Sequence, residues 1–209
     1  MAYPPQPWSL RGQLYVSVWA VPVADLPPIP PEVTAAVRLV RLGRYALVGT
    51  AWVDYQPGGD MAYRELLGAV LMRAGFSRPR VTITHIWVDS VDSRDGGREL
   101  WGIPKDLADF ELSDTDAAAV TAGQPIATAT IRRSRLALRL PIGFRVTQAL
   151  NGRALTTPVR ARARCGPARL NWQIASDGPL GFLSGRRPLL SLAAADFDMR
   201  FGTAAPPPP

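Results

Sequence analysis

The chain of 209 residues has one lysine, Lys105, and all of its other basic side chains apart from a single histidine are arginines. Arginine stays protonated, so it cannot supply a free amine, and a lone lysine in such a chain is a candidate for amine chemistry. Lys105 lies in the segment GRELWGIPKDL (residues 97–107), where glycine and proline fix an irregular backbone and apolar side chains flank the lysine. Burial disfavours an ammonium ion, so we expect an apolar pocket to lower the pKa of Lys105 toward neutrality and to free a nucleophilic amine.

A free amine attacks a ketone or aldehyde and forms an imine, whose protonated form withdraws electrons from the neighbouring carbon. This chemistry supports carbon–carbon cleavage, enolisation or aldol reactions. The plainer interpretation is that Lys105 is a surface lysine without a chemical role.

Other site chemistries have little support in the sequence. One histidine (His85) and one cysteine (Cys165) provide no metal-ligand cluster, so we expect neither a metal nor another cofactor. His85 lies within the alternating segment ITHIWV, which favours a hydrogen-bonded sheet residue over a catalytic one. Neither a G-x-S-x-G nucleophile elbow nor a G-x-G-x-x-G or P-loop segment is present.

The lysine segment resembles the G-R-E-x-x-x-x-P-K-K-L stretch of the acetoacetate decarboxylases. Residues 62–66 (AYREL) resemble the Tyr-x-Glu segment of that family, and Arg11 matches an arginine that precedes the family's first strand. Residues 178–180 (GPL) follow the family more loosely. The resemblance covers most of the chain and implies a homo-oligomer with an antiparallel β-barrel-like fold.

The resemblance also implies roles for individual residues. Lys105 would form a Schiff base with a keto acid, Glu65 would orient the amine or substrate and shuttle protons, and Arg11 would bind a substrate carboxylate near the pocket mouth. We also place Tyr63 and Trp101 at the substrate. The structural alternatives are that Glu65 is a carboxylate on a strand surface and that Arg11 is a surface residue.

Two departures from the family pattern bear on the chemistry. Asp106 stands where the family has a second lysine, and a carboxylate that shared the pocket would raise the pKa of Lys105. The family's other pocket glutamate would fall near Gly49 or Thr50, neither of which is acidic. For Arg98 and Glu99, which flank the lysine, we expect a structural ion pair that holds the segment.

These departures leave three hypotheses for the function. The first is a carbon–carbon lyase that uses a Lys105 imine for decarboxylation or aldol-type chemistry on a keto acid, in secondary metabolism. The second is a tailoring cyclase of a polyketide-like intermediate on the same scaffold, and the third is a non-catalytic ligand-binding or nucleic-acid-associated protein. Trp52, Trp87 and Trp101 are candidate pocket-lining residues that would suit a larger and less polar substrate than acetoacetate.

The elements that must position these residues are mostly short strands separated by Gly, Pro and Asp. Strands are predicted at 13–21, 45–55, 63–72 and 80–88, with a short helix at 32–39 and a polar loop at 89–98. Further strands are predicted at 108–112, 125–132, 135–140, 159–165, 169–175 and 189–201. The fold class is therefore mainly β (α+β), an antiparallel barrel-like arrangement with few short helices.

The remaining features suit one cytoplasmic domain. We assign residues 1–203 to a single domain, in which the first ten residues are disordered or extended, followed by a disordered Pro-rich tail at 204–209. No apolar run approaches the roughly 20 residues that span a bilayer. The net charge of +7 is spread along the chain, and the alternating arginines of PVRARARC (residues 158–165) fit a solvated strand face, so nucleic acid is not an expected partner.

Overall fold

The computed structural model describes residues 3–75 and 79–204, and it is built almost entirely of strands. The strands are β1 (Trp8–Pro22), β2 (Arg38–Leu39), β3 (Arg41–Leu42), β4 (Tyr45–Gln56), β5 (Tyr63–Arg73), β6 (Arg80–Val88), β7 (Lys105–Leu107), β8 (Asp109–Leu112), β9 (Asp116–Thr121), β10 (Gln124–Arg133), β11 (Leu138–Leu150), β12 (Arg153–Ile174) and β13 (Leu190–Phe201). The helices are α1 (Pro31–Ala36), α2 (Val91–Trp101) and two 3-10 turns, Val23–Asp25 and Gly181–Leu183. The predicted fold class, mainly β with few helices, is confirmed.

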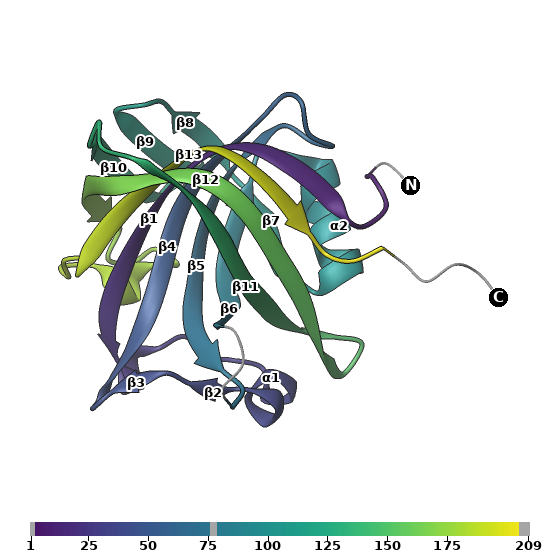
Figure 1. The fold of residues 1–209 in the computed structure, drawn as a ribbon. Coiled ribbons are helices and arrows are strands. Elements are labelled where there is room, and N and C mark those ends of the chain that lie inside the picture. The colour runs from purple at the N-terminus through teal and green to yellow at the C-terminus, as the bar shows by residue number, and fades with distance from the viewer. Residues whose placement is uncertain (1–2, 76–78, 205–209) are drawn as a thin grey trace.

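Seven of the strands pair in a closed circuit. The order is β11–β6–β5–β4–β1–β13–β12, and β12 also pairs with β11, which completes the ring seen in Figure 1. The pairings are antiparallel except those of β6 with β11 and with β7. Because side chains alternate across each strand, one set of positions faces the interior of the ring and the other set faces outward.

The second half of β12 leaves the ring and carries β10, β9 and β8 as a wing of the same sheet. This wing covers the outward face of β1, β4, β5 and β6 and buries a second core there, with Tyr15, Trp52, Leu66 and Trp87 on the ring side. A third core lies under α1 around Trp19, Val33, Val48, Val70 and Leu183. The ring is thus packed from outside, which leaves its interior available for a site.

Several predicted elements differ from the observed ones. Residues 91–98 of the predicted loop 89–98 belong to helix α2, and the predicted strands 159–165 and 169–175 fall within the single strand β12, except for residue 175. β1 begins at Trp8, which is buried, so residues 8–10 are extended and belong to the first strand. The tail predicted at 204–209 lies, except for Ala204, outside the described residues.

Two local predictions agree with the structure. In PVRARARC the three arginines at positions 160, 162 and 164 are exposed, whereas Val159 and Ala163 are buried on the inner face of β12. Separately, within residues 3–75 and 79–204, no helix has the length and apolar character needed to cross a membrane.

Candidate active site in the interior of the strand ring

Strands β4 and β5 place three polar side chains at one end of the ring interior. Tyr55 ends the inward-facing series of β4, and Tyr63 and Glu65 begin that of β5, where Tyr55 pairs directly with Tyr63. All three side chains are buried. Glu65 is therefore not the strand-surface carboxylate of the alternative interpretation, because its carboxylate faces the ring interior.

Helix α2 closes this end of the ring and delivers the lysine segment. Ser90 caps the helix by accepting a hydrogen bond from Ser93 N (3.2 Å), and Gly102 ends it in the left-handed conformation (φ 66°). The chain then turns through Ile103 and Pro104 into β7, which pairs in parallel with β6 so that Lys105 lies opposite Ile86. Lys105 thus enters the interior beside Glu65.

Gly97 of α2 makes room for the lysine stem. A Cβ atom at this position would lie 2.7 Å from Lys105 Cδ and 2.9 Å from Cε, closer than packed carbon atoms approach. At the neighbouring Gly96, a Cβ would lie 2.6 Å from the ring of Trp8. The two glycines let α2 pack directly on the reactive side chain and on β1.

The ammonium group of Lys105 has an acceptor for each of its three protons. Nζ donates to Glu65 Oε2 (2.9 Å), to Ser93 Oγ (2.8 Å) and to the hydroxyl oxygen of Tyr63 (3.2 Å). Tyr55 donates from its hydroxyl to the other oxygen of Glu65, Oε1 (3.3 Å). Nζ also lies 4.8 Å from the centre of the Tyr63 ring, a cation–π distance.

The electrostatics of this group oppose the prediction of a lowered lysine pKa. Burial alone lowers the pKa of Lys105, but the Glu65 carboxylate and the Tyr63 hydroxyl stabilise the ammonium ion, and the pKa lies above its ordinary value. Burial raises the pKa of Tyr63 and raises that of Tyr55 well above the ordinary range. The prediction is therefore wrong for the ligand-free protein, in which Lys105 and Glu65 form a buried ion pair.

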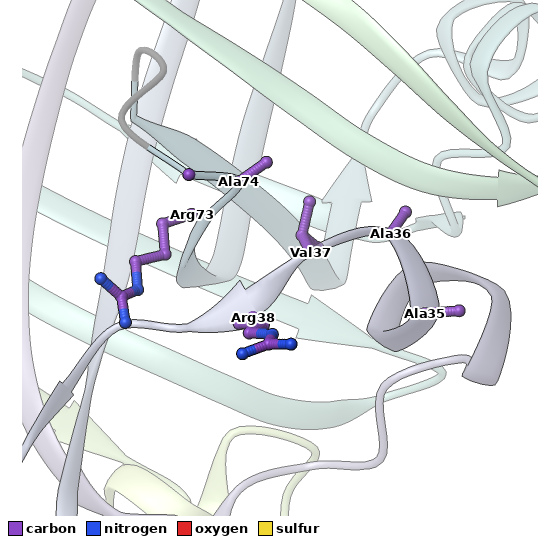
Figure 2. Close-up of a pocket in the computed structure, with 7 residues that line it drawn as sticks. Ala35, Ala36, Val37, Arg38, Arg73 and Ala74 are labelled. Carbon is purple, nitrogen blue, oxygen red and sulfur yellow. The ribbon is translucent and has the colours of Figure 1, made fainter.

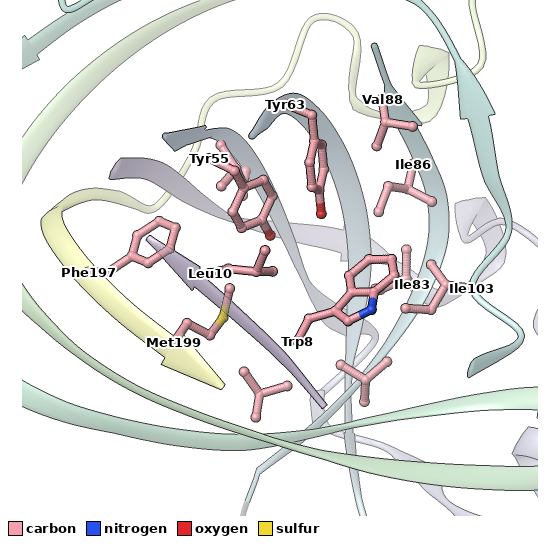
Figure 3. Packing of buried hydrophobic residues seen from close by; sticks show 14 of the residues in the cluster. Trp8, Leu10, Tyr55, Tyr63, Ile83, Ile86, Val88, Ile103, Phe197 and Met199 are labelled. Carbon is pink, nitrogen blue, oxygen red and sulfur yellow. The ribbon is translucent and has the colours of Figure 1, made fainter. Parts of the chain in front are cut away.

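A cavity of about 390 Å³ extends from Lys105 through the ring interior. Figure 3 shows part of its wall, with the Tyr55 and Tyr63 hydroxyls facing inward among aliphatic and aromatic side chains. Its apolar lining includes Trp8, Leu10, Leu14, Val16, Val53, Leu67, Ile83, Ile86, Ile103, Phe144, Val146, Phe197 and Met199. Among the lining residues in the described part of the chain, Lys105 is the sole cation and Glu65 the sole carboxylate.

The tryptophans divide between this cavity and the packed core. Trp101 lines the cavity as predicted, and its Nε1 donates to Gln6 Oε1 (3.0 Å). Trp52 and Trp87 face outward into the core under the wing, so their predicted place in the pocket is wrong. Trp8, which was not predicted, lines the cavity and packs edge-on against Trp101.

Arg11 lies outside the cavity of its own chain. It alternates with Leu10, which faces inward, and its half-exposed side chain pairs with Asp198 on β13 at 3.6 Å. The structure therefore does not bring Arg11 to the cavity of its own chain, and its role at a substrate stays a prediction.

The residues around the lysine pair differently from the prediction. Asp106 is exposed on the opposite side of β7 from Lys105 and lies 3.8 Å from Arg98, while Glu99 accepts a hydrogen bond from the Tyr3 hydroxyl. The predicted Arg98–Glu99 ion pair is therefore wrong. Because Asp106 faces solvent, it is not part of the group of side chains that contacts Nζ.

The position of the family's second glutamate holds no acid here. Gly49 and Thr50 both line the cavity, and the Thr50 hydroxyl accepts a hydrogen bond from Trp19 Nε1 (2.9 Å). His85 lies outside the cavity lining and stacks on Trp87 at 5.9 Å, as expected for a sheet residue. Within residues 3–75 and 79–204, no three His, Cys, Asp or Glu side chains gather where they could hold a metal ion.

Sequence reasoning missed two partners of Lys105, Ser93 and Gly97, both on helix α2, and it missed Tyr55, which hydrogen-bonds to Glu65. The helix that carries two of them was predicted as a loop because its sequence, VDSRDGGRELW, combines two glycines with many polar residues. Ser90 as an N-cap, Asp92 in the first turn and Gly102 just after the last turn are the capping signals that could have identified this helix.

A second cavity, of about 460 Å³, lies between the end of α1 and the end of β5 (Figure 2). Among the described residues, its lining consists of Arg38, Arg73, Ala35, Ala36, Val37, Ala74 and Gly75. These residues include neither a nucleophile nor a carboxylate, so the cavity at Lys105 is the better candidate for chemistry.

Comparison with solved structures shows the same fold. An acetoacetate decarboxylase from Legionella pneumophila subsp. pneumophila str. Philadelphia 1 superposes with a TM-score of 0.68 at 16% identity, covering 98% of this chain and 90% of that one. An acetoacetate decarboxylase-like enzyme from Sphingomonas wittichii RW1 gives 0.64 at 15% identity, covering 98% and 93%. The enduracididine biosynthesis enzyme MppR, in complex with pyruvate, gives 0.63 at 15% identity, covering 96% and 90%.

Sequence comparison identifies the family directly. Among proteins with curated descriptions, no sequence matches the chain. The sequence profile of the acetoacetate decarboxylase (ADC) family matches residues 25–169, which contain both Glu65 and Lys105 and make up more than half of the chain. The chain therefore belongs to the acetoacetate decarboxylase family.

Proposed function

We propose that the protein is an imine-forming carbon–carbon lyase that acts on a keto acid or related carbonyl compound. The observation that carries the proposal is the position of Lys105 Nζ, buried at one end of an apolar cavity and within 2.9 Å of a carboxylate. The family match and the fold shared with decarboxylases support it. A role in secondary metabolism and a homo-oligomeric state, both expected from the resemblance, are part of the same proposal.

The ion pair between Lys105 and Glu65 in the ligand-free site determines the first step of the reaction. Lys105 is an ammonium ion in the ligand-free site, so it must transfer a proton before it can attack, and Glu65 is hydrogen-bonded in position to receive it. The ion pair and the neutral amine–carboxylic acid pair hold the same number of protons. An apolar ligand that displaces water from the cavity favours the neutral pair, because desolvation penalises charges.

The next steps follow from imine chemistry. The amine adds to the carbonyl carbon, and the oxygen takes up one proton from the attacking nitrogen and the proton held by Glu65 before it leaves as water. The iminium nitrogen then accepts the electron pair of the breaking bond. That bond is either to a carboxylate, which departs as CO₂, or to an aldol carbon, which departs as an aldehyde once its hydroxyl proton has passed to Glu65. Protonation of the resulting enamine carbon and hydrolysis release the product ketone and restore Lys105.

The residues around Nζ have separate tasks in this scheme. Ser93 and Tyr63 hold Nζ toward the cavity through their hydrogen bonds, and Tyr55 orients the Glu65 carboxylate. MppR, which shares this fold, has been crystallised with the condensation product of pyruvate and imidazole 4-carboxaldehyde. For the present chain, the substrate that fits the cavity determines whether the reaction is decarboxylation or aldol-type cleavage.

A second candidate is a tailoring cyclase in which Lys105 acts without an imine. One observation favours it: the three acceptors around Nζ hold the lysine as an ammonium ion, which is a proton donor and not a nucleophile. In that role Lys105 would protonate a carbonyl oxygen of a folded polyketide-like chain while Glu65 removes a proton from carbon.

Intact-protein mass spectrometry after borohydride reduction separates the two candidates. The protein is incubated with acetoacetate, pyruvate or 2,4-pentanedione and reduced, alongside the Lys105→Arg variant. The lyase proposal predicts one covalent adduct per chain that is absent from the variant; an adduct present in both would mark the N-terminal amine. If the native protein gains no adduct between pH 6 and 9 with any of these carbonyls or with a long-chain ketone, imine formation is refuted and the cyclase takes its place.

A further inference from the structure

The cavity is polar at one end only. Lys105, Glu65, Tyr55 and Tyr63 gather where β4 ends and β5 begins, whereas the inward-facing positions farther along these strands, such as Leu67 and Leu71, are apolar or lack a side chain. A ligand that fills this space therefore needs one polar head at Lys105 and an apolar body that follows the ring interior.

The polar end is closed to solvent. Helix α2 and the first residues of β1 pack over it, and Trp8, Trp101 and Tyr63 are each less than 7% exposed. Lys105 itself is 3% exposed. A substrate must therefore reach the lysine from the other end of the ring.

The opposite end carries exposed apolar side chains on the inner faces of the strands. Leu138 and Leu140 continue the inward-facing series of Ile142 and Phe144 on β11, yet they are 64% and 45% exposed. On β13, Leu190 and Leu192 pair with Val18 and Val16, which line the cavity, and are 49% and 45% exposed. We call these four leucines the leucine rim.

The leucine rim lies far from Lys105 along the strands. β1 and β13 run antiparallel, with Trp8 opposite Phe201 at the lysine end and Val18 opposite Leu190 at the rim. Leu10 and Val18, both in the cavity wall, are separated by roughly 26 Å of extended chain. The cavity is thus elongated, with an apolar mouth that resembles the exposed patches of binding sites.

Small residues keep the middle of this passage open. The inward-facing positions there include Gly49, Ala51, Ala69, Ala161, Ala163 and Ala194. A Cβ at Gly49 would meet its nearest neighbour, Ala69 O, at 4.0 Å, so larger side chains fit the backbone but would occupy the passage. Protein interiors are otherwise close-packed, and an apolar space of this size suits an apolar ligand better than water.

We propose that the substrate is a ketone or keto acid carried at the end of a long apolar chain. Its carbonyl end enters first through the leucine rim and reaches Lys105, and its apolar chain then lies along the passage. This substrate class rests on the proposed imine function of Lys105. It follows from the single polar end, the single lining cation and the exposed rim, none of which a small and fully polar keto acid such as pyruvate would require.

The test compares trapping of 2-butanone and 2-nonanone by borohydride in the wild-type protein, in two narrowed variants and in a control. Gly49→Leu and Ala161→Leu place a leucine in the passage from different strands. If one variant fails to fold, the other still tests the proposal. Thr128→Leu adds the same side chain at an exposed position of β10. The measured quantity is the ketone concentration that labels half of Lys105, read by intact mass after a fixed time.

In the wild type and in Thr128→Leu, we expect the half-labelling concentration of 2-nonanone to be at least tenfold lower than that of 2-butanone. In a narrowed variant that folds, we expect the two ketones to have the same half-labelling concentration. The proposal is overturned if both ketones label the wild type equally, or if 2-nonanone keeps its lower half-labelling concentration in both Gly49→Leu and Ala161→Leu. If neither ketone labels Lys105, the imine function fails. The passage is then tested by displacement of the bound dye N-phenyl-1-naphthylamine, followed by its fluorescence. The proposal requires that 1-nonanol displace the dye from the wild type and not from the narrowed variants, and any other result overturns it too.

Discussion

Replacing Glu65 by glutamine removes the carboxylate that faces Lys105 Nζ across 2.9 Å and keeps the shape of the side chain. With an effective dielectric constant of about 20, two opposite unit charges at that distance attract by about 6 kcal/mol. The amide oxygen can still accept the hydrogen bond from Nζ. We therefore expect the pKa of Lys105 to fall, because burial then dominates over the remaining neutral partners.

The single lysine makes this pKa directly measurable. Protein labelled with ¹³C at the lysine Cε gives one lysine signal, whose chemical shift is followed from pH 6 to 11 in the wild type and in Glu65→Gln. Asp106→Asn is the matched control, since it removes a carboxylate one residue away that faces solvent. It should leave the pKa of Lys105 nearly unchanged, because exposed charges interact weakly. The reasoning is refuted if Glu65→Gln leaves the pKa unchanged, or if the wild-type lysine already titrates near neutrality.

Three further outcomes are expected. Gly97→Ala should destabilise the protein by about 1–3 kcal/mol in urea unfolding and reduce trapping at Lys105, because its Cβ would overlap the lysine stem; normal stability and trapping would show that α2 does not pack this closely. Arg11→Ala should change the concentration of acetoacetate that half-saturates trapping by less than about twofold, because Arg11 lies outside the cavity; a tenfold rise would mean that it reaches a substrate after all. Burial raises the pKa of Tyr55 in the native protein, whereas in the unfolded chain Tyr55 ionises near pH 10. The contribution of Tyr55 to stability is therefore complete below pH 10 and declines by up to about 1.4 kcal/mol per pH unit above it. Tyr55→Phe should therefore flatten the fall of unfolding free energy between pH 10 and 11, and an unchanged slope would contradict this.

The strands that carry the site were predictable from sequence because their side chains follow the period of two. The predicted boundaries of β4, β5 and β6 agree with the observed ones to within a residue, and they suffice to place Tyr63 and Glu65 on one face. The segment around Lys105 was predictable as a site because of its lone lysine and its resemblance to a known family.

The rest of the site depends on tertiary packing. Helix α2 has low intrinsic propensity at its two glycines, and it is stabilised where those glycines meet Trp8 and Lys105, which no local pattern reveals. The direction of the lysine pKa was mispredicted for a related reason. Sequence indicated an apolar environment, but the result depends on three acceptors contributed by β5 and α2.

The outward-facing tryptophans show the same limit. Trp52 and Trp101 are equally apolar in sequence, yet one packs under the wing and the other lines the cavity. Alternation predicts that successive residues of a strand face opposite sides, but it does not say which side is the ring interior. That choice is fixed by the pairing of β12 with both β11 and β13, a contact between segments distant in the chain.

Oxygen exchange under turnover conditions, without any reductant, shows whether Lys105 forms an imine. Each cycle of imine formation and hydrolysis replaces the carbonyl oxygen by one from water, so incubation of 2-nonanone in H₂¹⁸O reports the reaction by mass spectrometry. We predict that the wild-type protein accelerates ¹⁸O incorporation well above buffer and that Lys105→Arg does not. If the two proteins exchange oxygen at the same rate, Lys105 does not form the imine and this account of the site is wrong.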